Sequence, residues 1–236
     1  METKQLGNGN GKLVGNEIHV PHLGEILAFD LPIAERDYFN NAMGAIDRKK
    51  LLRPTTAQIF SLIDLAWGNL EEGTCDGIIA KMLEDSIFTS TENLWGKDNV
   101  IVYDNPNGKM PSDRKSLIKL HKNGDKRVRV VPYGFKTEIQ SVSDFVKNPF
   151  VIAHCGGNKD FTEDLVARIA ENIGNPGVTD YYHPVHMYTS IGSPFSFDKR
   201  VVRQLRLMGN QGDGWSNAYT GVRVVSDSQV ARHEEK

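Results

Sequence analysis

The spacing of apolar residues predicts two helices in the first half of the chain. The clearer one follows Pro54, and its apolar stripe consists of Ile59, Leu62, Ile63 and Ala66. Thr55 with Gln58 three residues later forms a capping-box pattern at the start of this helix. A second helix is predicted over residues 76–85, where Ile78, Ile79, Met82 and Leu83 form the apolar face.

Further helices are predicted in the second half. The longest covers residues 160–173, and the residues expected at its ends are Asp160 or Thr162 as the cap and Gly174 as the terminator. A short basic helix is predicted before Asn123-Gly124, and a two-turn helix is predicted after Ser141, whose side chain is a suitable cap.

Short apolar or alternating runs predict strands between these helices. Residues 99–103 form one run, closed by turn-forming residues, and residues 128–131 alternate charge with valine. Pro132 places the second strand at an edge or ends it. The run FVIAHC, residues 150–155, is interpreted as a buried interior strand because it is short, apolar and bounded by Pro149 and Gly156.

The two ends of the chain differ from its middle. Residues 1–20 are rich in Gly and Asn and are expected to form a flexible leader, and residues 227–236 a polar tail. From Gly177 to Val225 short apolar pieces alternate with Pro, Gly, Ser, Asn and Asp, without a helical period. We therefore expect one α+β domain over residues 21–226, with a loop-rich C-terminal part.

The composition is that of an ordinary globular protein. The chain has 236 residues, with 39% hydrophobic and 25% charged, and a net charge of -2. This balance gives no reason to expect a nucleic-acid partner, and the set Lys115, Lys119, Lys122, Lys126, Arg127 and Arg129 is interpreted mainly as a solvated face. No window has the ~20 apolar residues of a membrane span, and the N-terminus lacks a signal-peptide core. A soluble protein is expected, whether cytoplasmic, cell-surface or virion-associated.

Candidate catalytic and metal-binding patterns are weak. Cys75 and Cys155 lack CxxC spacing and are expected to be free buried thiols. The pairs His19/His22 and His183/His186 have HxxH spacing, but each contains or adjoins a proline, so turn or core histidines are favoured over a zinc site. No cofactor and no metal are expected. The neighbours His154 and Cys155 would point to opposite faces of a strand, so a thiol nucleophile would need another base.

The segment GNQGDGWSNAYTGVRVV, residues 209–225, brings together residue types that dominate binding surfaces. Its polar and aromatic residues directly precede a strand-like run, which would fix their positions. The alternative is that Trp215 and Tyr219 only cover the core of a loop-rich region.

Three segments carry a resemblance to a known family: LRPTTAQIFSLIDLA at 52–66, VRVVPYGFKTEIQSVSDFVKNPFVIAHCG from 128, and RQLRLMGNQGDGWSNAYTGVRVV at the C-terminus. The chain resembles the variable proteins of diversity-generating retroelements, especially archaeal members. The resemblance implies a C-type-lectin fold of the formylglycine-generating-enzyme type. It also implies a non-enzymatic protein that binds an unidentified protein or surface ligand through a face altered by adenine-directed mutagenesis.

In that family, diversified positions lie among fixed framework residues, and the variable region would cover about residues 188–225. The diversified positions implied here are Met208, Asn210, Gln211, Gly212, Gly214, Trp215, Asn217 and Tyr219, with Ser193, Phe195 and Phe197 upstream. The framework residues implied are Leu205, Leu207, Ser216, Gly221, Val222 and Arg223. Gly221 is expected in a conformationally demanding turn.

The chain also departs from related proteins. Formylglycine-generating enzymes use paired cysteines in their C-terminal portion, but no cysteine follows Cys155 here. The acidic motifs of calcium-dependent lectins are missing around Trp215 and Asn217, so neither calcium nor carbohydrate is implied. The competing hypothesis is an enzyme with the formylglycine-generating-enzyme fold, or a thiol hydrolase that uses Cys155.

Overall fold

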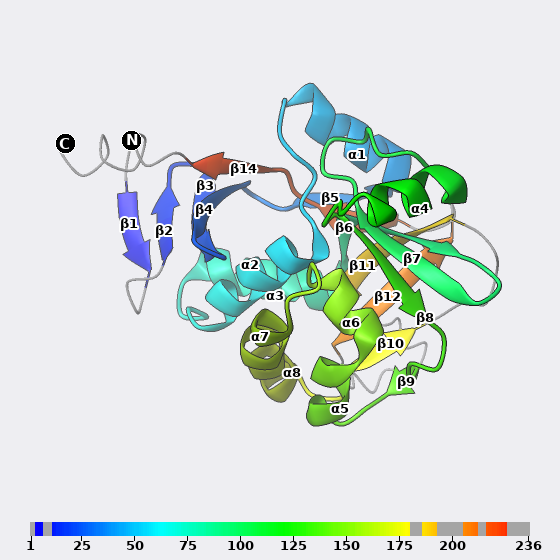
Figure 1. Cartoon of the computed structure of the whole chain (residues 1–236). Helices are drawn as coiled ribbons and strands as arrows, with labels where there is room; N and C mark the ends of the chain where they lie inside the picture. Colours follow the sequence, from blue (N-terminus) through cyan, green and yellow to red (C-terminus); the bar gives the residue numbers. More distant parts are fainter. Residues whose placement is uncertain (1–2, 7–10, 180–185, 193–204, 212–215, 226–236) are drawn as a thin grey trace.

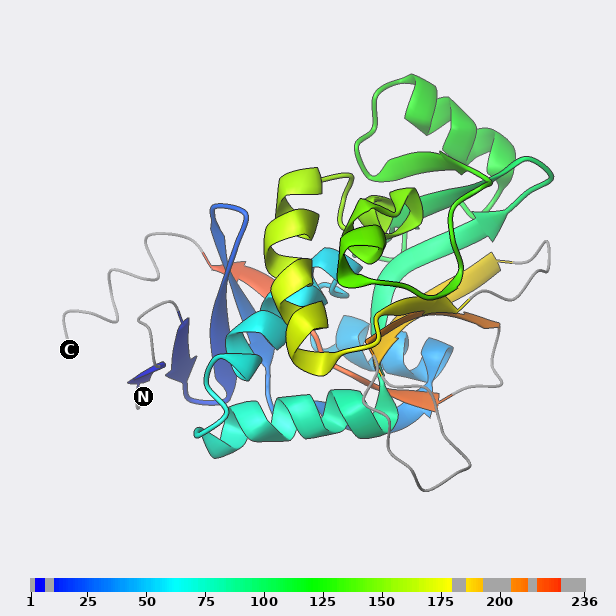
Figure 2. The same cartoon turned by 90° about the horizontal axis from the view of Figure 1, so that it is seen from below.

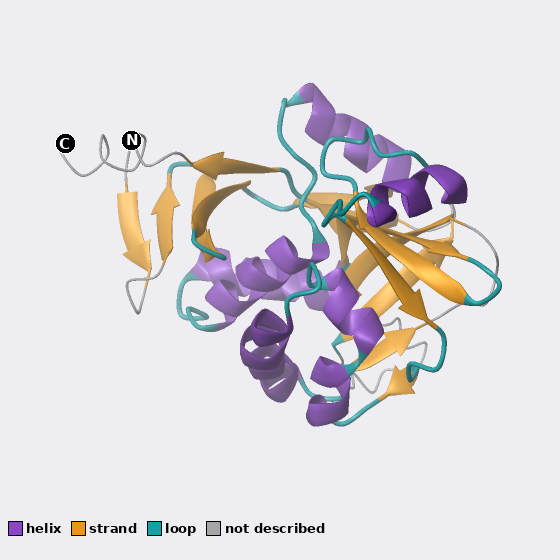
Figure 3. Ribbon diagram, in the orientation of Figure 1, coloured by secondary structure: helices purple, strands orange, loops and turns teal. Residues whose placement is uncertain are grey.

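The computed structural model describes residues 3–6, 11–179, 186–192, 205–211 and 216–225 (Figure 1). Within these residues the protein is a mixed α/β structure with a smaller and a larger sheet (Figure 3). The smaller sheet is antiparallel, and its strands, in spatial order, are β1 (Thr3–Leu6), β2 (Gly11–Val14), β3 (Glu17–His22), β4 (Glu25–Asp30) and β14 (Val222–Val225).

The larger sheet has three arms around its central strand, β6 (Ile87–Trp95). One arm contains β13 (Ser216–Tyr219) and β5 (Ala34–Tyr38), and another contains β7 (Asn99–Asp104) and β8 (Val128–Pro132). The third arm consists, in order, of β11 (His186–Gly192), β12 (Arg206–Gln211), β10 (Gly177–Thr179) and β9 (Glu138–Ile139). In the larger sheet as a whole, the described strand pairs are antiparallel except for β13 with β6 and β10 with β12.

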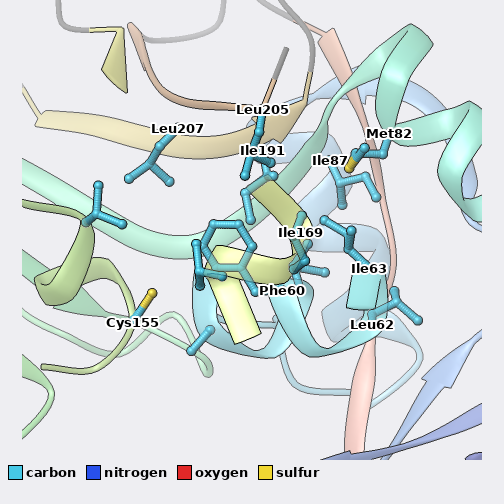
Figure 4. Packing of buried hydrophobic residues seen from close by; sticks show 14 of the residues in the cluster. Phe60, Leu62, Ile63, Met82, Ile87, Cys155, Ile169, Ile191, Leu205 and Leu207 are labelled. Atoms are coloured by element: carbon cyan, nitrogen blue, oxygen red, sulfur yellow. The ribbon is translucent and has the colours of Figure 1, made fainter. Parts of the chain in front are cut away.

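Helices cover both faces of the larger sheet. The helices on the face of the main core are α2 (Thr56–Trp67), α3 (Gly73–Asp85), α5 (Val142–Lys147), α6 (Pro149–His154), α7 (Lys159–Phe161), a π-helical turn (Thr162–Val166) and α8 (Ala167–Ile173). On the other face, α1 (Phe39–Arg48) packs on β5 and β13, and α4 (Arg114–Lys122) packs on β8. Figure 4 shows Phe60, Ile63 and Ile169 from the helices packed near Ile191 and Leu207 of the sheet and near Leu205, which directly precedes β12.

Several sequence predictions are confirmed. The helix after Thr55 forms with both hydrogen bonds of its capping box, and Ser141 caps α5 by accepting a hydrogen bond from the Asp144 backbone. The predicted strands at 99–103 and 128–131 form β7 and β8, and among the described strands β8 pairs only with β7, as Pro132 indicates. Gly174 ends α8 with a φ of 85°.

The prediction of an interior strand at residues 150–155 is wrong, because Pro149–His154 forms helix α6. Asn148 caps this helix by accepting a hydrogen bond from the Phe150 backbone, and Pro149 occupies its first turn, where a proline needs no N–H partner. The run is apolar throughout because the helix is buried: Phe150, Val151, Ala153 and His154 have little exposed surface.

Two further expectations need correction. The segment 1–20 was expected to be a flexible leader, but it contributes β1, β2 and most of β3 to the smaller sheet. Gly15, with a φ of 57°, lies in the tight turn that lets β2 pair with β3. The helical run from Lys159 is capped by Asn158, not by Asp160 or Thr162, since the Asn158 side chain accepts from the Phe161 backbone at 3.0 Å.

Candidate functional site

The C-terminal residues join the two sheets. β13 lies between β5 and β6, and β14 pairs with β4 in the smaller sheet (Figures 1 and 2). Between them, Thr220 donates its hydroxyl to the Asp30 carbonyl at 2.8 Å, and Asp30 N–H donates to the Gly221 carbonyl at 3.0 Å. The C-terminal strands are therefore held by backbone and side chains from the first forty residues.

The apolar framework residues expected in this segment are buried. Leu205 and Leu207 are 0% and 1% exposed and pack against Ile191 and the helices of the main core (Figure 4). Val222 is 1% exposed in the same cluster, as is its neighbour Ala218 at 0%, which was not among the expected framework residues. Burial of these side chains anchors β12, β13 and β14 in turn.

Gly221 is required for a reason different from the one expected. Its backbone is outside the left-handed region, so the expected demanding turn is wrong. Instead, a Cβ on Gly221 would lie 2.6 Å from Leu51 Cδ1 and 2.8 Å from Leu51 Cβ. Close approach of the Leu51 side chain therefore excludes a side chain here, where neighbouring Leu52 and Val222 exchange backbone hydrogen bonds of 2.8 and 2.9 Å.

Arg223 makes a bidentate ion pair with Glu17 on β3. Arg223 Nε donates to Glu17 Oε1 at 2.9 Å and Nη2 donates to Oε2 at 2.6 Å. Partial burial acts to raise the pKa of Glu17, but the hydrogen bonds and charge of Arg223 outweigh it and lower that pKa below its usual value. This pair ties the last described strand to the N-terminal sheet across 206 residues of sequence.

The structure brings some of the expected ligand-binding positions together. Met208, Asn210 and Gln211 are in β12, at the arm that pairs with β11. Helices α2 and α3 contact β11 and belong to the main core, which also contains Leu205 and Leu207. Helix α1 packs on the arm of β5 and β13, and α4 packs on the arm of β7 and β8.

Other expected positions are in different surroundings. Asn217 is only 6% exposed in β13, and Tyr219 is half-buried against the cluster formed by Phe39, Ala42, Met43, Ile46 and Phe88. Tyr219 therefore contributes to packing under α1, and Asn217 is buried within the strand. Ser193, Phe195, Phe197, Gly212, Gly214 and Trp215 lie outside the described residues.

Cys155, the nucleophile of the alternative thiol-hydrolase hypothesis, is buried. Cys155 is free and 0% exposed, and burial raises the pKa of its thiol to about 12. Burial also raises the pKa of the free Cys75 thiol to about 11, with a smaller contribution from Glu72. His154 is equally buried, its pKa is lowered to about 3 by desolvation, and its Nδ1 is 2.8 Å from the Phe150 carbonyl oxygen.

The described histidine pair, His19 and His22, lies in structural contacts. His22 Nδ1 is 2.8 Å from Ser61 Oγ, its ring meets Phe161 edge-on, and burial lowers its pKa to about 4. His19 Nε2 lies 3.5 Å from Glu17, while His183 is outside the described residues. Among the residues that the structure describes, no three His, Cys, Asp or Glu side chains gather as a metal site.

Central strand β6 carries a buried polar run that the sequence patterns did not reveal. Its five consecutive buried residues are Thr89, Ser90, Thr91, Glu92 and Asn93. Thr91 donates to Asp104 at 2.7 Å, and Glu92 accepts from the Tyr103 hydroxyl at 2.7 Å. The signal that could have found this strand is the group Ile87, Phe88, Thr89 and Thr91, since these residue types are enriched in strands.

Comparisons with models of protein families, with curated proteins and with solved structures find no match for this chain. In the described part of the chain, no helix combines the length and apolar character that crossing a bilayer requires.

Proposed function

We propose that this protein is a non-enzymatic recognition protein with a C-type-lectin-like fold, which binds its ligand through a diversified C-terminal face. The proposal rests on the resemblance of the C-terminal segment to retroelement variable proteins. The observation that carries it furthest is the burial of Leu205, Leu207 and Val222, which the resemblance implies to be invariant framework. A varying surface needs such a fixed support, because each new side chain must leave the backbone unchanged.

The proposed face is the side of β11 and β12 opposite the main core. In β12, the buried Leu207 alternates with positions 206, 208 and 210. The proposal assigns binding to the β12 positions Met208 and Asn210. It assigns Trp215 the role of an aromatic anchor, since tryptophan is enriched among residues that dominate binding energy.

The environment of the thiols favours this proposal over a thiol hydrolase. A nucleophilic cysteine needs a lowered pKa and access to its substrate. Cys155 has neither property, because its thiol is fully buried and its pKa is raised to about 12. His154 is held by the Phe150 carbonyl in the same helix and is also buried, so it is poorly suited to act as the base.

Two matched libraries test the proposal. One randomises Met208, Asn210, Gln211 and Trp215, and the other randomises Leu205, Leu207, Ala218 and Val222. Displayed on yeast, most members of the first library should resist protease, because substitutions at a supported surface leave the core intact. Most members of the second should be cleaved, because core truncations cost about 2–5 kcal/mol each.

Selection on an immobilised test protein, serum albumin, then asks whether the first library can supply new specificity. The proposal predicts protease-resistant binders that differ at the four randomised positions and compete for one surface. Equal protease sensitivity of the two libraries, or a first library that folds but yields no binder, would contradict it.

A further inference from the structure

A cavity of about 680 Å³ lies beside α2, where this helix meets the smaller sheet and α8. Its lining includes Ser61, Asp64 and Leu65 from α2, and Leu165 and Arg168 from the helical run that ends in α8. Positions 61, 64 and 65 share one face of α2, and positions 165 and 168 share one face of the other helix. A volume of this size is typical of sites for small molecules.

The charged groups of the cavity wall neutralise each other. Its ionisable residues are Asp64 and Arg168, and Arg168 Nε and Nη2 donate to the two carboxylate oxygens of Asp64 at 3.3 and 3.0 Å. Ser61 Oγ lies 2.8 Å from His22 Nδ1, and burial lowers the pKa of His22 to about 4, so this imidazole is neutral near pH 7. The wall therefore carries no net charge and favours a neutral ligand over an ion.

One buried acceptor in the wall has no partner. Asn69, just after the end of α2, lines the cavity and is only 4% exposed. Its Nδ2 donates to the Leu65 carbonyl at 2.7 Å, which fixes the orientation of the amide. The other amide atom, Oδ1, is buried and has no hydrogen-bond partner within the described chain. Because such an acceptor costs stability until a donor reaches it, the site favours a ligand with an N–H or O–H group.

An aromatic side chain lies close to this acceptor in the sequence and in the same wall. Trp67 is half-buried and lines the cavity together with the aliphatic side chains of Leu6, Val20 and Leu165. A flat aromatic ring gains both buried apolar area and ring-to-ring contact beside an indole. The wall thus combines one unused acceptor with apolar surface.

We propose that this cavity binds a small neutral aromatic molecule with one N–H or O–H donor, of the indole or phenol class. The donor bonds to Asn69 Oδ1, and the ring packs against Trp67 and the neighbouring aliphatic side chains. The site is separate from the β12 positions Met208 and Asn210, so it does not depend on the binding face proposed above.

An NMR titration of the isotope-labelled full chain with indole locates the site. Indole is added to about 5 mM, several times the dissociation constant of below about 1 mM expected for a ligand of this size. The side-chain N–H signal of Trp67, assigned by its loss in Trp67→Phe, should shift in a saturable way. The signal of Trp95, which is buried among Phe135 and Phe150, is the internal control and should not move.

The role of Asn69 is tested with a second probe, benzofuran, which has nearly the shape of indole but no N–H group. The full chain should prefer indole by roughly 3- to 10-fold, the value of one net hydrogen bond. Asn69→Leu removes the acceptor and should abolish this preference. Its matched control, Asn172→Leu, removes an exposed amide from the same cavity wall and should retain the preference.

The comparison of the two probes on the unaltered chain decides the matter even if Asn69→Leu does not fold. Leu165→Trp, which fills the cavity from its half-buried position, should also abolish binding of both probes. The proposal is overturned by the absence of a saturable Trp67 shift, by equal affinities for indole and benzofuran, or by a preference that persists in Asn69→Leu. Tighter binding of the cation tryptamine than of indole would overturn the assignment of a neutral ligand.

Discussion

Gly221 and Leu51 approach each other so closely that no side chain fits between them. A Cβ on Gly221 would stand 2.6 Å from Leu51 Cδ1, and the contact lies where the C-terminal segment passes from one sheet to the other. Gly221→Ala should therefore lower the free energy of unfolding by about 1–3 kcal/mol, as overpacking does. Urea denaturation measures this loss.

The control for this prediction is Gly77→Ala in α3, where a new Cβ would meet nothing within 4 Å. Alanine in an open helical position should stabilise the protein by about 0.5–1 kcal/mol. Leu51→Ala should remove the contact with Leu51 Cδ1 while leaving Cβ in place, so the double variant Leu51→Ala/Gly221→Ala should lose less stability than the two single losses combined. Strict additivity would show that contact with Leu51 Cδ1 is not the cause.

The buried thiols should be nearly inert in the folded protein. Because burial raises the pKa of Cys75 to about 11 and that of Cys155 to about 12, thiolate formation near pH 8 is suppressed by roughly a hundredfold or more. Ellman's reagent should react with both thiols in guanidinium and with neither promptly in buffer. Rapid native reaction of Cys155, identified by its loss in Cys155→Ala, would revive the thiol-enzyme alternative.

Acid should destabilise the protein through His154. Its pKa is about 3 when folded and about 6.5 when exposed, so between these values the unfolded chain binds the extra proton. The stabilising contribution is complete above pH 6.5 and is lost as the pH falls, with a slope of up to about 1.4 kcal/mol per pH unit. His22, with a folded pKa of about 4, adds a similar slope between pH 6.5 and 4.

Denaturation curves of His154→Gln at a series of pH values measure this contribution. The variant should lose stability at neutral pH because the site is fully packed, but the dependence of its unfolding free energy on pH between 6.5 and 4 should be shallower. His121→Gln is a suitable control, since that side chain is exposed on α4. An unchanged slope in His154→Gln would contradict the assignment.

The Arg223–Glu17 pair should couple the C-terminal strand to the smaller sheet. A double-mutant cycle with Arg223→Met and Glu17→Gln should give a coupling free energy of about 1 kcal/mol or less, because both side chains are partly exposed. Since the folded pKa of Glu17 is lowered, this contribution is present above its usual pKa and is lost as the pH falls through the folded value. Coupling that persists in acid would contradict the ionic origin.

Elements with strong local signals could be predicted from the sequence. The capping box of Thr55 and Gln58 and the cap at Ser141 define α2 and α5, because these side chains bond to their own helix starts. Helix α6 was mistaken for a strand because a short apolar run fits either structure once it is buried. The neighbouring Asn148 and Pro149 contained the local signal for a helix start.

Features that depend on distant residues could not be predicted in this way. The polar run in β6 is stable in the interior because distant residues hydrogen-bond to it: Thr91 meets Asp104, and Glu92 meets Tyr103 and Asn105. The need for glycine at 221 was recognisable, but its cause lies in Leu51, 170 positions away. Likewise, the burial of Asn217 follows from the position of β13 between two strands of the N-terminal half.

The most direct test of the proposed function is to sequence the DNA downstream of this gene. The proposal predicts a near-copy of the segment that encodes residues 193–225, differing only where the copy carries adenine, close to a reverse-transcriptase gene. The substituted codons should include those of Met208, Asn210 and Trp215 and spare those of Leu205, Leu207 and Gly221. Absence of such a repeat from the genome would contradict the diversified-binder proposal and favour a protein with one fixed ligand.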